Sequence, residues 1–523
     1  MHGRLVRRWI VGTIALVTLA AACSLPSTTP GTAGFPNGVA AGDVTADGAI
    51  LWTRTSGAAS VDLAVYDSVL HASLPLLVAG TTPVFTASSA TLAADDFTTK
   101  IPVTGLLSNH IYFYRFTNGA EKSQEGRFVT APGPAEAASF RFVVAADADG
   151  FPVGGPPAFN NFEVLNAARG EQPAFFAFLG DTIYSDSSNA PGPITTVDQY
   201  RDAHEQNRSF TNLRDLMSAT GTYAQADDHE VYNDYDGETV DPARYAAGWE
   251  AFHDWMPTDT ANALVDATCA GGPRYFTQKW GTQAEIFQLD ERSCRSDQDP
   301  VKTACTTGVD LDLAPTAPSA LRLAAGLTAS PPAGCITALD DPLRTFLGPV
   351  QKAAFLADLS ASTAKWKIIL SEDAIQQFYA LPYDRWEGYG AERAEVLNHI
   401  RDNSIDNVVF LTTDLHANIY NDVFIDTTTD PTPIAYEAIS GPIATNTFKQ
   451  EIINAVGAEY VAPLQAVLAV QGVDCQSLDV YSYQVVSVDA GAGTLTLTSK
   501  DRFGNVVGND LDPSVKCKKV LGP

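Results

Sequence analysis

Residues 174–184 read Ala-Phe-Phe-Ala-Phe-Leu-Gly-Asp-Thr-Ile-Tyr. The first six residues form an uninterrupted apolar run, which predicts a β-strand buried on both faces, as in the sheets of α/β proteins. Gly180 then allows a tight turn directly before Asp181. Because ligands bind beyond the carboxyl ends of strands in open α/β sheets, this stretch predicts a binding site around Asp181.

Similar strand patterns occur elsewhere in the second part of the chain. Predominantly apolar runs at Phe140–Ala146, Lys367–Leu370 and Val408–Leu411 predict further buried strands, and Val350–Ala364 predicts a helix between two of them. Strands that alternate with helices predict a layered α/β domain, which we place at residues 136–515. The two-residue periods at Val480–Val488 and Thr494–Thr498 predict an antiparallel pair that completes a sheet.

Side chains that bind metals follow these strands. A single carboxylate after a strand is most often the cap of the next helix, but several carboxylates buried together are costly unless cations compensate them. Oxygen and imidazole ligands suit Fe, Mn, Zn, Mg or Ca. The sequence therefore predicts a metal site at the strand ends, and its candidate donors are Asp147, Asp149, Asp181, Asp227, Asp228, His229, Asp414 and His416.

The first part of the chain has a different pattern. Residues 35–132 contain short strands of alternating polarity, such as Ala49–Arg54, Val61–Tyr66 and Ile111–Phe116, separated by turn residues. This spacing predicts a β-sandwich. Residues 131–135, Ala-Pro-Gly-Pro-Ala, predict a linker.

The N-terminus predicts export. In residues 1–22, three arginines precede the apolar run Trp9–Ala22, which ends in small residues before Cys23. This is the layout of a signal peptide. Cys23 also resembles the cysteine of a bacterial lipoprotein box, although Ala20 stands where Leu is usual; residues 23–34 would then be a tether. Two adjacent arginines fit twin-arginine export or simply the basic region of the leader.

We therefore expect a periplasmic, extracellular or lipid-anchored protein at the bacterial cell surface. The run Trp9–Ala22 is too short for a comfortable membrane span and no other long apolar stretch follows it, so a lipid anchor would be the one link to the membrane.

Six cysteines follow Cys23, and an even number in an exported chain predicts disulfides. Clustering along the chain predicts a bridge between Cys475 and Cys517 and pairing of the other four among themselves. No spacing of Cys or His indicates structural zinc. The loop-rich stretch around 296–345 predicts an insertion stapled by disulfides. The four remaining cysteines are Cys269, Cys294, Cys305 and Cys335.

The formal net charge is −28, from 33 Lys and Arg against 61 Asp and Glu. A field of this sign repels polyanions, and bulk nucleic-acid binding needs Lys and Arg to displace counterions, so that class of function is excluded. An anionic substrate would need a local positive site, which a cluster of metal ions would provide.

Five separated motifs resemble the PhoD-type alkaline phosphatase/phosphodiesterase family of the calcineurin-like metallophosphoesterases. The similarity covers roughly residues 35–510 in order. It implies a four-layer α/β/β/α metallophosphatase core, preceded by an N-terminal fibronectin-III-like β-sandwich at residues 35–132. The motifs are Gly180-Asp181-x-x-Tyr184, Asp227-Asp228-His229-Glu230, Leu289–Arg295, Asp414-x-His416 and, in the sandwich, Gly38–Asp43 with Leu51–Arg54, Val103–Leu106 and Tyr114–Phe116.

Carried over residue by residue, the resemblance implies a dinuclear metal centre. Asp147, Tyr184 and His416 would bind a first metal, Fe(III). Asp228 and Asp414 would bind a second, Ca(II), and Asp181 would bridge both; Zn, Mn or Mg are alternatives. Close family members carry a cysteine where this chain has Asp147. Because Asp is the usual ligand there in the wider superfamily, metal binding is chemically retained, while the identity of the metal is open.

The resemblance also implies three catalytic residues. His229 and Arg292 would face the phosphate, and Arg295 would help or brace the loop. Asp227 is expected to cap or brace, and no role is assigned to Leu370–Asp373, which departs from the family pattern.

The expected function is hydrolysis of phosphate monoesters and diesters by an exported, monomeric enzyme. Its substrates would be small phosphoesters, with phospholipids or teichoic-acid-like diesters as further candidates. The alternatives are a phospholipase-D-like phosphodiesterase and a non-catalytic cell-surface protein. A non-catalytic domain should have lost ligands to Ala, Ser or Gly, whereas all aligned positions here keep donors.

Overall fold

The computed structural model describes residues 34–67, 82–259, 264, 266, 269–271, 274–308, 310–379, 382–430 and 432–522. The predicted signal peptide, Cys23 and nearly all of the tether lie outside these residues. Among the helices that are described, none combines the length and the apolar character that a membrane crossing needs.

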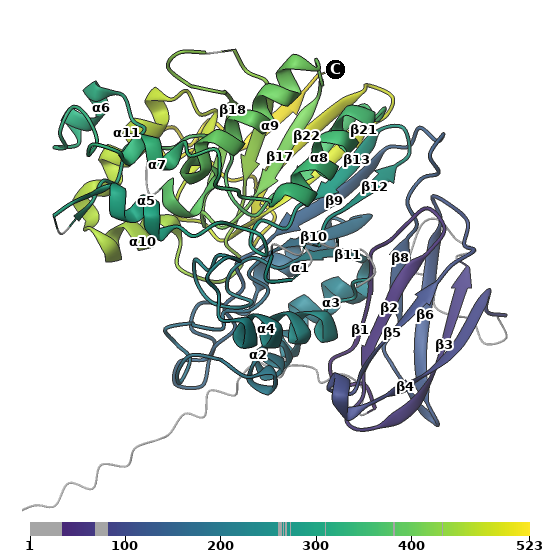
Figure 1. Ribbon diagram of the computed structural model, residues 1–523. Helices are drawn as coiled ribbons and strands as arrows, with labels where there is room; N and C mark the ends of the chain where they lie inside the picture. Colours follow the sequence, from purple (N-terminus) through teal and green to yellow (C-terminus); the bar gives the residue numbers. More distant parts are fainter. Residues whose placement is uncertain are drawn as a thin grey trace, which may run out of the picture.

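A nine-stranded sheet runs through the middle of the molecule (Figure 1). The neighbouring strands β9, β10, β11 and β1 are parallel, whereas β21 and β22 form the predicted antiparallel pair. In spatial order the strands are β23 (Lys518–Leu521), β22 (Thr494–Asp501), β21 (Ser482–Asp489), β9 (Phe140–Ala145), β10 (Phe175–Leu179), β11 (Gly221–Gln225), β1 (Val39–Gly42), β2 (Ala49–Arg54) and β5 (Thr98–Val103).

A seven-stranded sheet contains the other predicted buried strands. Its strands β13, β16, β17 and β19 are parallel neighbours. In spatial order it consists of β12 (Phe276–Trp280), β13 (Ala284–Gln288), β16 (Trp366–Leu370), β17 (Val408–Thr412), β19 (Ala435–Ile439), β18 (Asn418–Val423) and β20 (Cys475–Ser477).

The uninterrupted apolar runs are explained by what covers the two faces of each sheet. One core cluster joins Phe142 and Phe175 of the nine-stranded sheet to Trp280 and Ile368 of the seven-stranded sheet. Alternate residues such as Val143 belong to a second cluster with helices α1 (Glu163–Gly170), α3 (Thr211–Ala219) and α4 (Pro242–Trp255). Helices α8 (Pro349–Ala361) and α9 (Gly390–Asp402) contribute to a third cluster, with β13, β16 and β17.

The N-terminal segment is joined to the rest more closely than the sequence suggests. Strand β1 pairs in parallel with β11, Ala41 opposite Gly221, so β1, β2 and β5 extend the nine-stranded sheet. The close fit is possible because β1 is small and apolar: a Cβ at Gly42 would lie 2.1 Å from the Pro257 carbonyl oxygen. The remaining strands of this segment form a sheet of their own: β3 (Ala59–Asp67), β4 (Phe85–Thr91), β6 (Ile111–Asn118), β7 (Glu121–Lys122) and β8 (Gly126–Val129).

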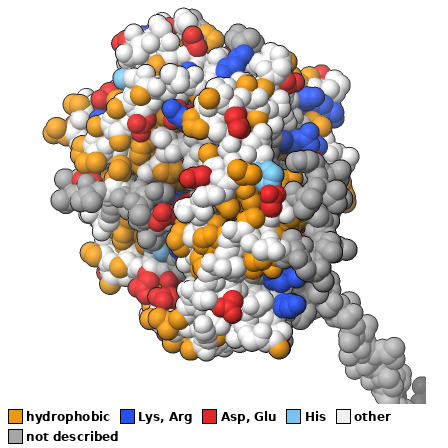
Figure 2. Space-filling view, turned by 90° about the vertical axis from the view of Figure 1, so that its right-hand side faces the viewer, with side chains coloured by type: hydrophobic (Ala, Val, Ile, Leu, Met, Phe, Trp, Pro, Cys, Tyr) orange, Lys and Arg blue, Asp and Glu red, His pale blue; other side chains and the backbone are white. Residues whose placement is uncertain are grey.

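On the face of the molecule that Figure 2 shows, basic side chains lie in small separate groups among acidic ones.

The disulfides pair as the clustering of cysteines predicts. They join Cys475 to Cys517, Cys269 to Cys294 and Cys305 to Cys335. The stretch 296–345 holds more regular structure than its loop-rich sequence suggests. It contains helices α5 (Asp299–Ala304), α6 (Ser319–Ala324) and α7 (Cys335–Leu339) and the short strands β14 (Thr306–Thr307) and β15 (Asp310–Leu311). The remaining helices are α2 (Val197–Ser209), α10 (Phe448–Ala455) and α11 (Val461–Val470), with short 3-10 turns at Ala93–Asp95, Pro382–Asp384, Trp386–Tyr389 and Ala458–Tyr460.

Candidate metal centre

The candidate ligands follow the carboxyl ends of β9, β10, β11 and β17. Asp147, Asp181, Asp414 and His416 all have left-handed backbone conformations, with φ of 64°, 48°, 54° and 51°. Such conformations are uncommon for residues other than glycine and concentrate at functional sites. Gly180 precedes Asp181 with φ of 83°, and a Cβ there would lie 2.5 Å from the Cβ of Asp227. Glycine is therefore required where β10 turns into the site.

The structure brings five of the six predicted ligand residues into adjoining groups. Donor atoms of Asp147, Asp181 and His416 lie within 4.8 Å of one another, as do those of Asp227, Asp228 and Asp414. A further group of Asp181, Asp228 and His229 links these two. Tyr184, the remaining ligand candidate, places its hydroxyl 3.1 Å from His416 Nε2. Asp181 thus stands between the two sides of the cluster, where a shared ligand would have to be.

The carboxylates have the unmet bonding capacity that a metal site requires. Asp147, Asp181 and Asp228 are at most 2% exposed. Within the described residues, no donor meets hydrogen-bond geometry at either oxygen of Asp147, at Asp181 Oδ2 or at Asp228 Oδ1. Buried polar atoms without partners are costly, and cations would compensate these. Hard carboxylate, phenolate and imidazole donors fit the ions that the sequence predicts.

Asp149 differs from Asp147 although it lies only two residues away. Its Oδ2 accepts a hydrogen bond from Ser187 Oγ at 2.6 Å, and its Oδ1 accepts one from the Phe151 backbone at 3.0 Å. Both oxygens are therefore satisfied by the protein. This carboxylate braces the loop, and Asp147 is the better candidate ligand.

The carboxylates of the cluster repel one another, so ionising all of them is unfavourable unless positive charge compensates them. Burial raises the pKa of Asp147 to about 7. Burial and the neighbouring Asp228 raise the pKa of Asp181 well above its usual range, and burial does the same at Asp414. Burial acts in the same direction on Asp228, but the Arg292 guanidinium, His229 and the Asp234 backbone N–H together outweigh it and lower the pKa of Asp228 to about 2. A negative cluster of this kind favours the binding of cations.

His416 is held in one orientation by Glu451 and by the Tyr184 hydroxyl. Its Nδ1 lies 2.7 Å from Glu451 Oε1. If Nδ1 carries the proton and donates it to this carboxylate, the lone pair of Nε2 points into the cluster, 4.0 Å from Asp147 Oδ1. Glu451 comes from α10, 35 residues further along the chain, and no sequence spacing predicts this contact.

His229 faces the cluster from the cavity side. Its Nδ1 lies 2.5 Å from Asp186 Oδ1, and Asp186 Oδ2 accepts a hydrogen bond from the Asn233 backbone at 2.7 Å. Its Nε2 lies 4.0 Å from both Asp181 Oδ2 and Asp228 Oδ1. Burial disfavours the charged imidazolium, but Asp228 and Asp186 outweigh it and raise the pKa of His229 to about 9. His229 is therefore equipped to donate a proton, and sequence analysis missed its partner Asp186.

Arg292 and Arg295 are buried in ion pairs with carboxylates, although the sequence predicts that Arg292 faces the phosphate. Arg292 donates from Nε to Asp227 at 2.6 Å and from Nη1 to Asp384 at 2.7 Å. Arg295 also donates to Asp384, at 2.8 Å, and to Asp373. Both side chains are fully buried, and neither lines the cavity in front of the cluster. The expected bracing role of Asp227 corresponds to its ion pair with Arg292.

A cavity of about 560 Å³ opens onto the cluster. The candidate site residues Tyr184, His229, Asp414 and His416 line it together with Asp186 and Glu451. This arrangement leaves space for a small ligand beside the unpartnered carboxylates.

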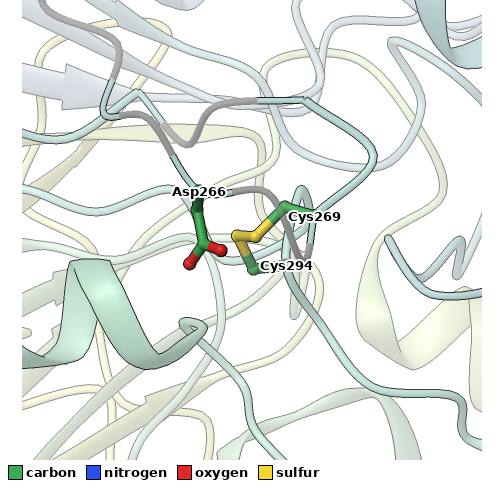
Figure 3. Close-up of side chains that lie close together, drawn as sticks. All are labelled: Asp266, Cys269 and Cys294. Atoms are coloured by element: carbon green, nitrogen blue, oxygen red, sulfur yellow. A yellow bond between two sulfur atoms is a disulfide. The ribbon is translucent and has the colours of Figure 1, made fainter.

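A further acidic grouping is not a thiolate site. Asp266 lies close to Cys269 and Cys294, but these two sulfurs are bonded to each other (Figure 3). Because metals bind cysteine as the thiolate, the grouping is structural.

Known proteins resemble this chain in sequence and in fold. Alkaline phosphatase D of Bacillus subtilis (strain 168) is 27% identical over 434 residues, which cover 75% of this chain and 66% of that protein. The match therefore spans slightly less than two thirds of the relative's length. A solved structure of PhoD aligns with a TM-score of 0.68 and 22% identity, covering 89% of this chain and 86% of that one. A purple acid phosphatase from yellow lupin (Lupinus luteus) seeds aligns with a TM-score of 0.53 and 10% identity, covering 93% of this chain and 75% of that one.

The two structural similarities indicate a shared fold. The family model of the PhoD-like phosphatase matches residues 145–495, and that of the PhoD-like phosphatase N-terminal domain matches residues 20–132. The first match alone covers more than half of the chain and includes every candidate ligand of the cluster. The chain belongs to the PhoD-like phosphatase family.

Proposed function

We propose that this protein is a metal-dependent phosphoric ester hydrolase of the alkaline phosphatase/phosphodiesterase type, acting on small phosphate monoesters and diesters. The observation that carries the proposal is the set of buried carboxylate oxygens of Asp147, Asp181 and Asp228 that lack protein donors. They lie at strand ends, beside His416 and Tyr184, and these two side chains line a cavity of ligand size.

In this proposal Asp147, Tyr184 and His416 hold one ion, Asp228 and Asp414 hold a second, and Asp181 is shared. Fe(III) suits the first position because phenolate and carboxylate are hard anionic donors, and Ca(II) suits the second, which is made of carboxylates. When bound, such ions polarise the phosphoryl group and activate a water for attack on phosphorus.

The chain's own residues then position the substrate and move a proton. His229 lines the cavity, and its Nε2 points toward Asp181 and Asp228. It would donate a proton to the oxygen of the leaving group, while Asp186 holds Nδ1 and keeps the ring in orientation. Arg292 and Arg295 would act on the substrate indirectly. Arg292 Nη2 lies 3.7 Å from Asp228 Oδ2 and would hold that ligand in place.

The finer architecture and location belong to the same proposal. We expect the core clusters described above to correspond to four layers, α/β/β/α, within residues 136–515. Residues 35–132 would form a fibronectin-III-like sandwich that shares one sheet with this core. Export by way of residues 1–22, with or without a lipid on Cys23, would place a monomeric enzyme outside the cytoplasm.

The test is an activity panel with metal content measured on the same samples. Protein stripped with a chelator and refilled with Fe(III) and Ca(II), or with Zn, Mn or Mg, would be assayed on nitrophenyl phosphate and bis-nitrophenyl phosphate. We expect turnover of both esters only by refilled protein, together with a higher melting temperature than that of the stripped form. Absence of turnover under every metal condition would contradict the enzymatic proposal.

A further inference from the structure

The stretch 296–345 contributes to the wall of the cavity. Gln298, Lys302 of α5 and Leu311 of β15 all line it. The stretch is anchored to the rest of the protein by a small buried cluster of Val301, Cys305, Cys335 and Tyr383. The disulfide Cys305–Cys335 joins two separate parts of the stretch. Lys302 thus projects from a helix turn whose neighbours are anchored.

Lys302 differs from the other cations around the site. Arg292 and Arg295 are buried in ion pairs with Asp227, Asp373 and Asp384. Arg385 also lines the cavity but is only 6% exposed and has interactions within the protein. In the part of the chain that the structure describes, Lys302 Nζ has neither a hydrogen bond nor an ion pair, so it remains available to a ligand.

Lys302 lines the same cavity as the candidate ligands Asp414 and His416. Its charge acts on the carboxylate of Asp234, which lies in the same cavity. The backbone N–H of Asp234 in turn donates to Asp228 Oδ2 at 2.5 Å. Asp234 therefore contacts the candidate ligand Asp228 and lines the cavity together with Lys302.

The size of the cavity leaves room for more than the reacting group. About 560 Å³ is in the range that holds a whole small-molecule ligand. If the reacting phosphoryl group lies at the carboxylate cluster, the rest of the ester extends into the remaining volume, which Lys302 lines. In a chain with a net charge of −28, an unpaired ammonium group here would favour an anion.

We propose that Lys302 forms a second anion subsite, which selects phosphoesters whose leaving group carries a further anionic group such as a phosphate or a carboxylate. This inference rests on the proposed function. It assigns to the 296–345 stretch a role in substrate selection, because the stretch supplies a cation outside the metal cluster.

The experiment compares two esters that differ only in the distal charge. The pair is 3-(carboxymethyl)phenyl phosphate and 3-(carbamoylmethyl)phenyl phosphate, whose leaving groups have similar reactivity. For the refilled wild-type protein we expect kcat/KM to favour the carboxylate ester about tenfold, mainly through KM, as for a hydrogen bond to a charged group. Lys302→Met should lower this ratio to about one, whereas Lys302→Arg should keep most of it.

Two controls separate a local subsite from general electrostatics. Lys279→Met removes the same charge from an exposed position on β12, outside the cavity lining, and should leave the ratio unchanged. Inhibition by inorganic phosphate should be similar in the wild type and in Lys302→Met, because phosphate competes with the reacting phosphoryl group at the metal cluster and Lys302 is not part of that cluster.

The outcomes distinguish the inference from the function on which it rests. Equal hydrolysis of both esters by the wild type, or an unchanged ratio in Lys302→Met, overturns the subsite and leaves the phosphatase proposal standing. Hydrolysis of neither ester by refilled wild-type protein overturns both. A loss of melting temperature in Lys302→Met without a change in the ratio would show that Lys302 only balances the charge of Asp234.

Discussion

Removal of the Asp147 carboxylate should have opposite effects on the metal-free and metal-loaded proteins. Both oxygens of Asp147 are buried without a donor in hydrogen-bond geometry among the described residues. In the metal-free protein the ionised group is therefore destabilising, and Asp147→Ala removes it. In the loaded protein the same group would be a ligand, so its loss removes metal-binding free energy that stabilises the folded state.

The magnitude in the metal-free protein follows from the pKa of Asp147. Burial raises this pKa from 3.8 to about 7. The unfolded chain loses the proton near 3.8 and the folded chain only near 7, so stability falls as pH rises between these values, and the full cost is present above them. This difference corresponds to at most about 4 kcal/mol. Because Asp147→Ala also loses about 2 kcal/mol of packing at any pH, we expect a net gain of about 2 kcal/mol at pH 8 and a net loss of about 2 kcal/mol at pH 4.

The assay is urea denaturation of stripped and refilled protein at the two pH values, with metal content measured in parallel. Asp149→Ala is the matched control, because both oxygens of Asp149 accept hydrogen bonds, from Ser187 and from the Phe151 backbone. Its removal leaves two donors without an acceptor, so we expect a loss of about 1 to 2 kcal/mol in the metal-free protein at both pH values.

Two results would refute this reasoning. If metal-free Asp147→Ala were less stable than the wild type at pH 8, the carboxylate would have a compensating partner. If the variant bound both metals fully, Asp147 would not be a ligand.

Further predictions concern other named side chains. Tyr184→Phe should abolish the visible phenolate-to-iron absorption of the Fe(III)-loaded protein and keep the far-ultraviolet circular dichroism, because only a hydroxyl is removed; persistence of the band would exclude Tyr184 as a ligand. Glu451→Gln should weaken metal binding about tenfold or more in a competitive chelator titration, because His416 loses the anionic partner of its Nδ1; an unchanged affinity would contradict the orienting role. His204 is buried and stacks on Trp255, and burial lowers its pKa to about 3 from 6.5. The unfolded chain therefore binds a proton first as pH falls, and His204 destabilises the protein by up to about 1.4 kcal/mol per pH unit between these values. His204→Leu should reduce this pH dependence in urea denaturation below pH 6.5, and an identical slope in both proteins would show that His204 is protonated in the folded state.

The strands of the α/β part could be predicted closely from the sequence. β10, β16 and β17 begin and end within one residue of the predicted apolar runs, because strands covered on both faces leave a continuous apolar signal. The partners of β1 could not be predicted. Its four residues carry no information about β11, about 180 positions further along the chain, beside which it lies. The sequence therefore predicts the strands of the N-terminal segment but not that they share a sheet with the core.

The site could be predicted to a similar extent. The ligand candidates stand directly after strands, so the pairing of β9 with β10 brings Asp147 and Asp181 together, whereas Asp414 reaches them only because the two sheets pack face to face. Residues that act through a partner could not be found in this way. Glu451 reaches His416 from a separate helix, and the burial of Arg292 depends on Asp384, which lies in a different loop.

The adjacent acids Asp227 and Asp228 show how one short motif serves both stability and binding. Asp227 is turned toward Arg292, and this buried ion pair fixes the backbone at the end of β11. Asp228 is thereby turned toward the cluster: its Oδ2 is held by the Asp234 backbone and by the charge of Arg292, while its Oδ1 has no donor. Burying an arginine is costly unless carboxylates surround it, and four of them meet Arg292. We therefore propose that Arg292, which the sequence assigns to the substrate, holds Asp227 in place so that its neighbour Asp228 can bind a cation.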